Sequence, residues 1–386
     1  MASCGAFARL AISRRSAHAR VACAPPPHEA SQVLQSVAIP EIWEPAIGRA
    51  YCLPVANDAL QQGGLKMRSV SNTWAVVLAG GDGSRLREIT TTAAGEVIPK
   101  QFCSLQRETC LLEDAIKRAQ AVAISQHICS VVAEQHRRWW SSALKALPAQ
   151  NIFVQSNNRG TAHGILFALL QIERRASNSV VVLLPADHYL TDETTMARSL
   201  RTATNLAADN EGLVYLLGAE PDHPDQELGY IVPSEHRRDA AAGVVRFAEK
   251  PTTEKARALI RDGALWNTFI LAGSVRALLN LFEGHFASTR EAMRHALDLA
   301  QSELVGPVAL ELLYADLESH DFSRDVLERH EQVLQVLRVP SCGWTDLGTP
   351  KRVEEAVRSL ARVRSPATTM PSAAGAHYLD LASNQR

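Results

Sequence analysis

The residues with the clearest chemical potential lie in a glycine-rich segment that follows an apolar run. Gly80–Arg85 reads Gly-Gly-Asp-Gly-Ser-Arg, and Lys100 follows it in Pro-Lys-Gln-Phe. Backbone N–H groups in such a turn can approach a phosphate closely. Arg85 adds a planar guanidinium, and Lys100 adds a mobile point charge. The segment predicts a nucleotide phosphate site formed by Leu78, Ala79, Gly80, Gly81, Gly83, Ser84 and Arg85.

Two familiar phosphate motifs do not fit this segment. The dinucleotide fingerprint G-x-G-x-x-G matches only Gly81 and Gly83, because its third glycine would fall on Leu86. The Gly-Lys-Ser/Thr ending of a P-loop is missing. On the glycines alone, a plain β-turn with a surface arginine stays open as the alternative.

A second candidate is Asp187, which follows the apolar stretch Val180–Leu184 after Pro185-Ala186. Mg²⁺ typically binds one or two protein carboxylates together with substrate phosphates, so Asp187 is a candidate magnesium ligand that needs a second carboxylate nearby. An ordinary acidic turn residue is the alternative reading.

Gly-Gly-x-Gly-x-Arg-Leu followed by Pro-Lys-Gln-Phe resembles the opening of the sugar-phosphate nucleotidyltransferases. It is closest to the mannose-1-phosphate guanylyltransferases. Further matching motifs occur in the expected order, from about residue 73 to residue 362. They lie at residues 159–162, 184–188, 229–231, 249–251, 265–267, 321–327 and 343–348.

The resemblance implies roles for particular residues. Asp346 would be the second ligand beside Asp187 of a Mg²⁺ cofactor, and Arg85, Lys100 and Lys250 would be the catalytic cations. Arg159-Gly160-Thr161-Ala162 opens a helix whose N–H groups can face the nucleotide. The further nucleotide-binding candidates are Gln155, Asn158, Gly160 and Thr161. The sugar-binding candidates are Gly229, Glu249, Lys250 and Asn267.

The reaction implied is transfer of a nucleotidyl group from GTP to mannose 1-phosphate, which gives GDP-mannose and pyrophosphate. Such a reaction depends on alignment and charge compensation and needs no protein nucleophile. Another nucleoside triphosphate or hexose 1-phosphate is the first alternative. A catalytically inactive regulatory subunit that binds nucleotide sugars is the second. The expected partners are these small molecules and possible further copies of the chain, with no nucleic acid and no membrane.

Composition limits the class of protein. The chain has 386 residues, 46% of them apolar, and a net charge of −1, so no global basic field favours nucleic acid. No apolar run is long enough for a transmembrane helix. The seven cysteines are odd in number and form no C-x-x-C pair, which is typical of reduced thiols in a cytoplasmic protein.

Apolar runs alternate with amphipathic stretches in the middle of the chain. This pattern favours an α/β fold with a mostly parallel sheet and helices on both faces, and the resemblance implies a Rossmann-like nucleotidyltransferase fold with a mixed sheet. The expected strands are Ala75–Ala79, Ile128–Ala133, Ile152–Gln155, Val180–Leu184 and Leu213–Gly218. The expected helices include Leu111–Val122, Ala162–Arg174 and Met196–Ala207. Ligands of such sheets bind beyond the carboxyl ends of the strands.

The expected domain is residues 73–364. Residues 1–72 form an N-terminal extension that is predicted to be non-catalytic. Its first 28 residues carry four arginines and no acid, as transit peptides do, although a solvated tail or an over-extended reading frame fits equally. Residues 365–386 are predicted to be an irregular tail.

Three departures from the family pattern affect the expected site. The spacer from Leu86 to Pro99 is longer than in many relatives. His163-Gly164 replaces the usual Pro-Ala, which puts base contacts in doubt. Thr268-Phe269 replaces a small residue and a glycine, which puts the shape of the sugar pocket in doubt.

Overall fold

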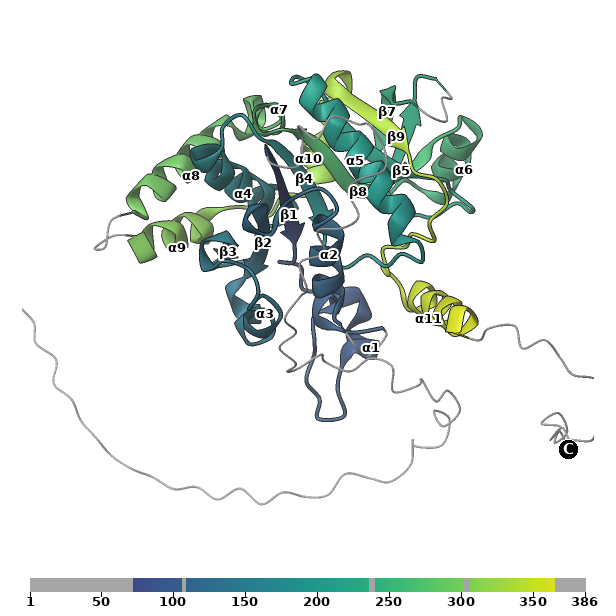
Figure 1. Ribbon diagram of the computed structural model, residues 1–386, viewed down its shortest axis with the longest axis horizontal. Helices are drawn as coiled ribbons and strands as arrows, with labels where there is room; N and C mark the ends of the chain where they lie inside the picture. The colour runs from purple at the N-terminus through teal and green to yellow at the C-terminus, as the bar shows by residue number, and fades with distance from the viewer. Residues whose placement is uncertain (1–71, 106–108, 236–239, 302–305, 365–386) are drawn as a thin grey trace, which may run out of the picture. The chain divides into compact units, whose positions relative to one another are not determined.

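The computed structural model describes residues 72–105, 109–235, 240–301 and 306–364. The predicted N-terminal extension, apart from Asn72, and the predicted C-terminal tail lie outside these residues. The proposed domain boundaries therefore stay predictions. The described residues build one nine-stranded mixed sheet with helices packed against it (Figure 1).

The strands follow the order β3-β2-β1-β4-β8-β5-β9-β7-β6, and its first six strands, from β3 to β5, can be followed from left to right in Figure 1. The pairings make seven of these strands run in one direction, with β7 and β8 antiparallel to them. The mostly parallel mixed sheet is therefore confirmed. The strands are β1 Thr73–Leu78, β2 Ile128–Ala133, β3 Ile152–Gln155, β4 Val180–Pro185, β5 Val214–Ala219, β6 Tyr230–Pro233, β7 Ala242–Ala248, β8 Leu265–Ser274 and β9 Leu334–Arg338.

All five strands expected from the sequence are present, with ends that shift by at most two residues. β2 and β4 are buried along their full length, as expected for strands covered on both faces. The antiparallel β8 was not expected. It separates β4 from β5, which are neighbours in sequence order among the strands.

The three expected helices are also confirmed, as α2, α4 and α5. α5 begins with a side-chain cap, because the Asp192 carboxylate accepts the Thr195 N–H at 3.0 Å. The helices are α1 Arg87–Thr90, α2 Leu111–Ala119, α3 Arg137–Ala143, α4 Thr161–Arg175, α5 Glu193–Asp209, α6 Thr253–Arg261, α7 Val275–Asn280, α8 Ala287–Leu299, α9 Gly306–Asp316, α10 Phe322–Asp325 and α11 Pro350–Arg364.

The sheet has a hydrophobic core on each face. Alternate side chains of β1 point to opposite sides. Val76 belongs to the core that includes residues of α4, α7 and α8, and Val77 belongs to the core that includes residues of α2, α3 and α5. Each such strand therefore contributes side chains to both cores, which explains why its sequence is apolar without alternation. These rigid strands support the loops at their carboxyl ends.

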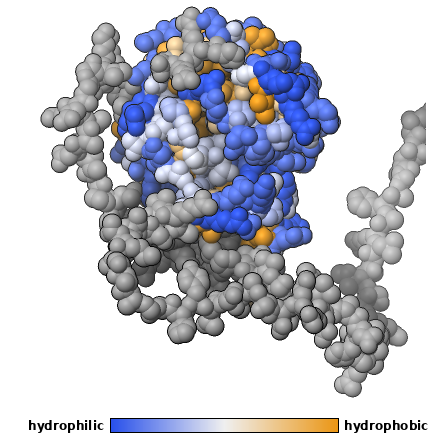
Figure 2. Space-filling model, turned by 90° about the vertical axis from the view of Figure 1, so that its right-hand side faces the viewer, coloured by the Kyte–Doolittle hydropathy of each residue, from blue (hydrophilic) through white to orange (hydrophobic). Residues whose placement is uncertain are grey.

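The described surface is mainly hydrophilic on the face drawn in Figure 2, where hydrophobic residues form separate small patches. Among the residues that the structure describes, no helix is both long and apolar enough to cross a lipid bilayer. Cys103, Cys110, Cys129 and Cys342 are buried and form no disulfide, so these four cysteines agree with the predicted reduced state.

Candidate active site

A cavity of about 410 Å³ opens at the carboxyl ends of β1, β3 and β4. Most of the residues predicted for the site line it, although they come from distant parts of the sequence. These are Leu78, Gly80, Gly81, Arg85, Lys100, Gln155, Asn158, Gly160, Thr161, Asp187, Gly229, Glu249, Lys250, Asn267 and Asp346. The predicted nucleotide residues Ala79, Gly83 and Ser84 do not line the cavity.

The glycine-rich segment turns away from β1 because its glycines leave room for neighbouring groups. Gly83 has a left-handed φ of 62°, and a Cβ there would lie 2.9 Å from the Lys100 backbone nitrogen. The Gln101 side chain donates to the carbonyls of Ala79 and Gly81, at 2.8 Å each. Gly83 therefore shapes the turn without lining the cavity, and Gln101 holds the turn in place.

Lys100 joins the two carboxylate-bearing segments. Its buried Nζ lies 2.9 Å from the Asp187 Oδ2 and donates to the Asp346 carbonyl at 2.6 Å. Burial alone would raise the pKa of the Asp187 carboxyl, but the Lys100 ammonium and His188 outweigh burial and lower it. Asp187 is therefore an anion at neutral pH.

A short backbone bridge joins the segments that carry Asp187 and Asp346. Tyr189 and Thr345 exchange two N–H···O bonds of 2.9 Å, which place the segment after β4 beside the segment before α11. The ring of His188 contacts Trp344 of the second segment edge-to-face. The Trp344 indole N–H donates to the His188 Nδ1 at 3.2 Å, and burial lowers the pKa of His188 to about 4, so the imidazole is neutral at pH 7.

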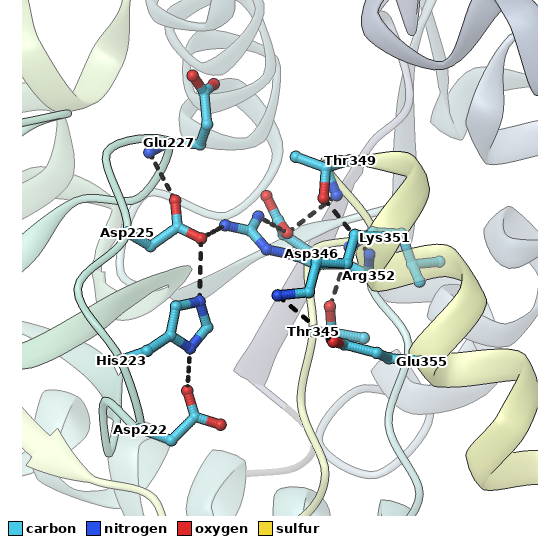
Figure 3. A network of polar contacts seen from close by, with 12 residues as sticks. Asp222, His223, Asp225, Glu227, Thr345, Asp346, Thr349, Lys351, Arg352 and Glu355 are labelled. Carbon is cyan, nitrogen blue, oxygen red and sulfur yellow. Dashed lines mark hydrogen bonds and ion pairs between the residues drawn. The ribbon is translucent and has the colours of Figure 1, made fainter.

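Asp346 is held from behind by a buried network (Figure 3). Arg352, at the start of α11, pairs with the Asp346 Oδ1 and with the Asp225 carboxylate. The Gly348 N–H donates to the same Asp346 Oδ1 at 3.0 Å. A Cβ on Gly348 would lie 2.5 Å from the Asp346 Oδ2, so only glycine fits there without displacing the carboxylate. The orientation of Asp346 is therefore fixed.

The donor set fits a magnesium ion in its chemistry. Within the described ranges, no group of three or more His, Cys, Asp or Glu side chains is placed to hold a metal. Mg²⁺ does not need such a group, because one or two carboxylates plus substrate phosphates are its usual partners in proteins. Asp187 and Asp346 supply two carboxylates that face one cavity.

The predicted sugar residues gather at the other end of the cavity. A Cβ on Gly229 would lie 2.5 Å from the Glu249 Oε2, so backbone and carboxylate are closely packed. Burial, followed by repulsion from Asp321, raises the pKa of Glu249 to about 7 despite the nearby Lys250 ammonium. The Asn267 Oδ1 accepts the Phe269 N–H at 3.0 Å. This end combines a hydrogen-bonding carboxyl, an amide and a cation.

The predicted nucleotide end is built on the first turn of α4. Gly160 precedes the helix with φ 83°, and a Cβ there would collide with the His320 carbonyl, so glycine is required. The Phe322 N–H donates to the Thr161 hydroxyl at 2.8 Å. Gln155 is buried in the cavity wall, and its Oε1 accepts the Tyr314 hydroxyl at 3.4 Å. Asn158 is at the edge, where its amide contacts Asp82.

Three non-glycine residues have positive φ angles in the described part of the chain. They are Lys250 (46°), Phe269 (57°) and Leu347 (50°). Lys250 and Phe269 line the cavity, and Leu347 follows Asp346. Such conformations cost about 1–3 kcal/mol each and cluster at functional sites. The strained backbone at the cavity is a reason, independent of any motif, to treat it as the candidate functional site.

Two of the three departures from the family pattern, the long spacer after Leu86 and the Thr268-Phe269 pair, have a defined structure near the cavity. The long spacer after Leu86 forms α1 and a turn closed by the Thr91–Val97 bridge. Phe269 lines the cavity and packs edge-to-face against Phe322. Its side chain therefore occupies space at the predicted sugar end of the cavity that a glycine would leave open.

The third departure, His163, does not line the cavity. Its Nδ1 lies 2.8 Å from the Arg159 carbonyl, and its ring contacts His320 and Phe286. Burial lowers the pKa of His163. His163 is therefore packed behind the predicted nucleotide end, whereas Gly164, the other half of the replacement, lines the cavity.

Sequence reasoning missed several residues that form or support the cavity. Arg352 and Asp225 lie in segments without a recognisable pattern, and their pairing depends on the tertiary fold. Glu227 lines the cavity and pairs with Arg85. His188 and Asp321 also line the cavity, and their places in the motifs at residues 184–188 and 321–327 are the sequence signal that could have found them.

Comparison with known proteins identifies the family of the chain. A model of the nucleotidyl transferase family matches residues 74–362. The mannose-1-phosphate guanylyltransferase of Escherichia coli (strain K12) is 28% identical over 294 residues, which cover 72% of this chain and 58% of the relative. The alginate biosynthesis protein AlgA of Pseudomonas aeruginosa is 27% identical over 71% of this chain and is covered to 56%. The chain spans about half the length of the curated relatives it matches.

Solved structures agree on the fold. A Thermus thermophilus structure, described as mannose-1-phosphate geranyltransferase, superposes with a TM-score of 0.62 at 26% identity. The match covers 74% of this chain and 79% of the other. A UDP-glucose pyrophosphorylase complexed with UDP-glucose superposes with a TM-score of 0.51 at 14% identity, over 76% of this chain and 100% of the other. The second likeness shows the fold alone.

Proposed function

The chain belongs to the nucleotidyl transferase family, and from this membership we propose that it transfers a guanylyl group from GTP to mannose 1-phosphate. The products are GDP-mannose and pyrophosphate. The observation that carries the proposal is the convergence of Arg85, Lys100, Asp187 and Asp346 in one cavity at the carboxyl rim of the sheet. The choice of base and sugar rests on the names of the curated relatives.

The proposed reaction is a single in-line displacement. A phosphate oxygen of mannose 1-phosphate attacks the α-phosphorus of GTP and forms a new P–O bond. The bond between the α-phosphorus and the bridging oxygen to the β-phosphate breaks, and pyrophosphate leaves with that oxygen. Two anions must approach each other, so catalysis depends on alignment and charge compensation.

Each cation has a distinct place in this proposal. Arg85 emerges from the glycine-rich turn with its side chain half exposed, where it can contact the departing pyrophosphate. Lys100 is buried between the two carboxylate segments and faces the reacting phosphates. Lys250 is next to Glu249 at the sugar end, where it contacts the sugar phosphate. Preorganised charges of this kind stabilise the transition state without reorganisation.

Asp187 and Asp346 are the residues that would hold a Mg²⁺ ion. A bound magnesium ion supplies positive charge that compensates the phosphate oxygens. The chain itself contributes the fixed orientation of Asp346, through Arg352 and Gly348, and the ionised state of Asp187, through Lys100.

The proposal is tested by measuring pyrophosphate release from four nucleoside triphosphates combined with several hexose 1-phosphates. We expect the highest kcat/KM for GTP with mannose 1-phosphate. If another nucleoside triphosphate and hexose 1-phosphate give the highest kcat/KM, the proposed substrates are wrong but the proposed type of reaction stands. No release from any pair, with nucleotide sugar still bound, would replace catalysis with a regulatory binding role.

A further inference from the structure

Arg85 is not free in the cavity, because it forms an ion pair with Glu227. The Arg85 Nη1 lies 2.5 Å from the Glu227 Oε2, and both residues line the cavity. The two side chains come from different segments: Arg85 from the turn after β1 and Glu227 from the segment between β5 and β6. The inference below rests on the proposed phosphate role of Arg85.

Glu227 is presented by a firmly held turn. The Asp225 Oδ1 accepts the Glu227 N–H at 2.7 Å. The Tyr230 hydroxyl closes the turn, because it accepts the Asp225 N–H at 2.7 Å and donates to the Asp225 carbonyl at 3.0 Å. Arg352 then anchors the Asp225 carboxylate, as Figure 3 shows. The backbone of Glu227 is therefore fixed against the network behind Asp346.

Arg85 is attached less firmly than Glu227 to the surrounding structure, since no described hydrogen bond other than the one to Glu227 holds its guanidinium. Its side chain is 50% exposed and starts from a short 3₁₀ turn, Ser84–Leu86. Across the described residues, Glu227 is the one acidic side chain that pairs with it. A guanidinium with one exposed partner can turn to another anion at small cost, since exposed ion pairs contribute little net free energy.

We propose that Glu227 is a competing anion that shares Arg85 with the pyrophosphoryl group of the substrate and product. Arg85 leaves Glu227 when a pyrophosphoryl group binds, and it returns when pyrophosphate departs. Glu227 also places a negative charge near the phosphates. Both effects weaken the binding of pyrophosphoryl ligands, so Glu227 sets their affinity and favours product release.

A purely structural ion pair makes a different prediction. If the pair only tied two loops together, its loss would change stability and leave pyrophosphate affinity the same or lower. The competing-anion role predicts a higher affinity when the carboxylate is removed. Binding measurements therefore separate the two roles.

The test measures binding of magnesium pyrophosphate and of GTP to the full chain by titration calorimetry. In Glu227→Gln we expect both ligands to bind about two- to five-fold tighter, because an exposed ion pair no longer competes. Glu220→Gln is the matched control. Glu220 lies in the same segment and pairs with Arg338, but it does not line the cavity, so its affinities should equal those of the wild type.

An Arg85→Ala background shows whether the effect passes through Arg85. The gain from Glu227→Gln should shrink in that background, because no guanidinium remains to be released. If Glu227→Gln is active but binds the two ligands no more tightly than the wild type, the competing-anion role is wrong while the proposed function stands. The same holds if Glu227→Gln raises the affinity just as much in the Arg85→Ala background. Absence of GTP and pyrophosphate binding in the wild type would overturn the proposed function as well.

Discussion

Glu249 is the residue whose substitution gives the sharpest quantitative expectation. Its pKa is raised from an ordinary 4.5 to about 7, chiefly by burial. In the unfolded chain the carboxyl ionises above pH 4.5, whereas in the folded chain it stays protonated until about pH 7. The folded state therefore loses stability as the pH rises through this window, because the unfolded state binds fewer protons there.

The magnitude follows from the two pKa values. The difference between 4.5 and about 7 is about 2.5 pH units, and each unit corresponds to about 1.4 kcal/mol, so the full cost is about 3 kcal/mol above pH 7. Glu249→Gln removes the charge and keeps the shape. We expect the variant to exceed the wild type in free energy of unfolding by about 2–3 kcal/mol at pH 8. The difference should disappear below pH 4.5.

Urea denaturation followed by tryptophan fluorescence at pH 4.5, 6, 7 and 8 measures this difference. The control is Glu254→Gln, because Glu254 is exposed on α6, where loss of a carboxylate should change stability little at any pH. The same Glu249→Gln variant should bind mannose 1-phosphate more weakly at pH 8, since it lacks the anionic acceptor. A stability difference that does not vary with pH, or a wild type that is more stable at pH 8, would refute the burial argument.

Three further predictions address the site and the domain boundary. Asp187→Asn should lower kcat sharply and raise the magnesium concentration needed for half-maximal rate, while circular dichroism stays unchanged; an unchanged kcat would remove Asp187 from the metal site. Lys100→Ala and Arg85→Ala should each lower kcat by about 10²–10³-fold, and steady-state kinetics with an effect confined to KM would indicate ground-state binding instead. A chain that starts at Ser71 should fold and keep the turnover of the full chain, whereas loss of soluble protein or of activity would place part of residues 1–70 in the fold.

Much of the parallel half of the sheet was predictable because its strands are short, apolar and followed by turn residues. β2 and β3 were predicted to the residue. β8 was harder to predict, because Leu265–Ser274 mixes polar and apolar residues. In the sequence, this segment stands out only for the sugar-binding candidate Asn267. Its place between β4 and β5 depends on pairing between segments far apart in sequence, which local periodicity does not encode.

In the candidate site, too, the residues that belong to local motifs were predictable, whereas the contacts set by the tertiary fold were not. The glycine-rich turn, Lys100, Asp187 and Asp346 were visible because each belongs to a motif with a chemical reason. Their mutual geometry was not visible, because the Tyr189–Thr345 bridge that pairs the two carboxylate-bearing segments has no local signature. The Asp225–Arg352 pair was missed for the same reason. The magnesium ion, the site roles and a cytoplasmic location stay predictions.

The central claim is that this cavity joins a sugar phosphate to a nucleotide. Phosphorus NMR of the full chain with GTP, mannose 1-phosphate and magnesium tests it most directly. The account predicts that the two substrates are consumed together and that GDP-mannose and pyrophosphate appear in equal amounts, with no product from Asp187→Asn on the same time scale. Release of phosphate or pyrophosphate without a sugar nucleotide, or equal turnover by Asp187→Asn, would contradict it.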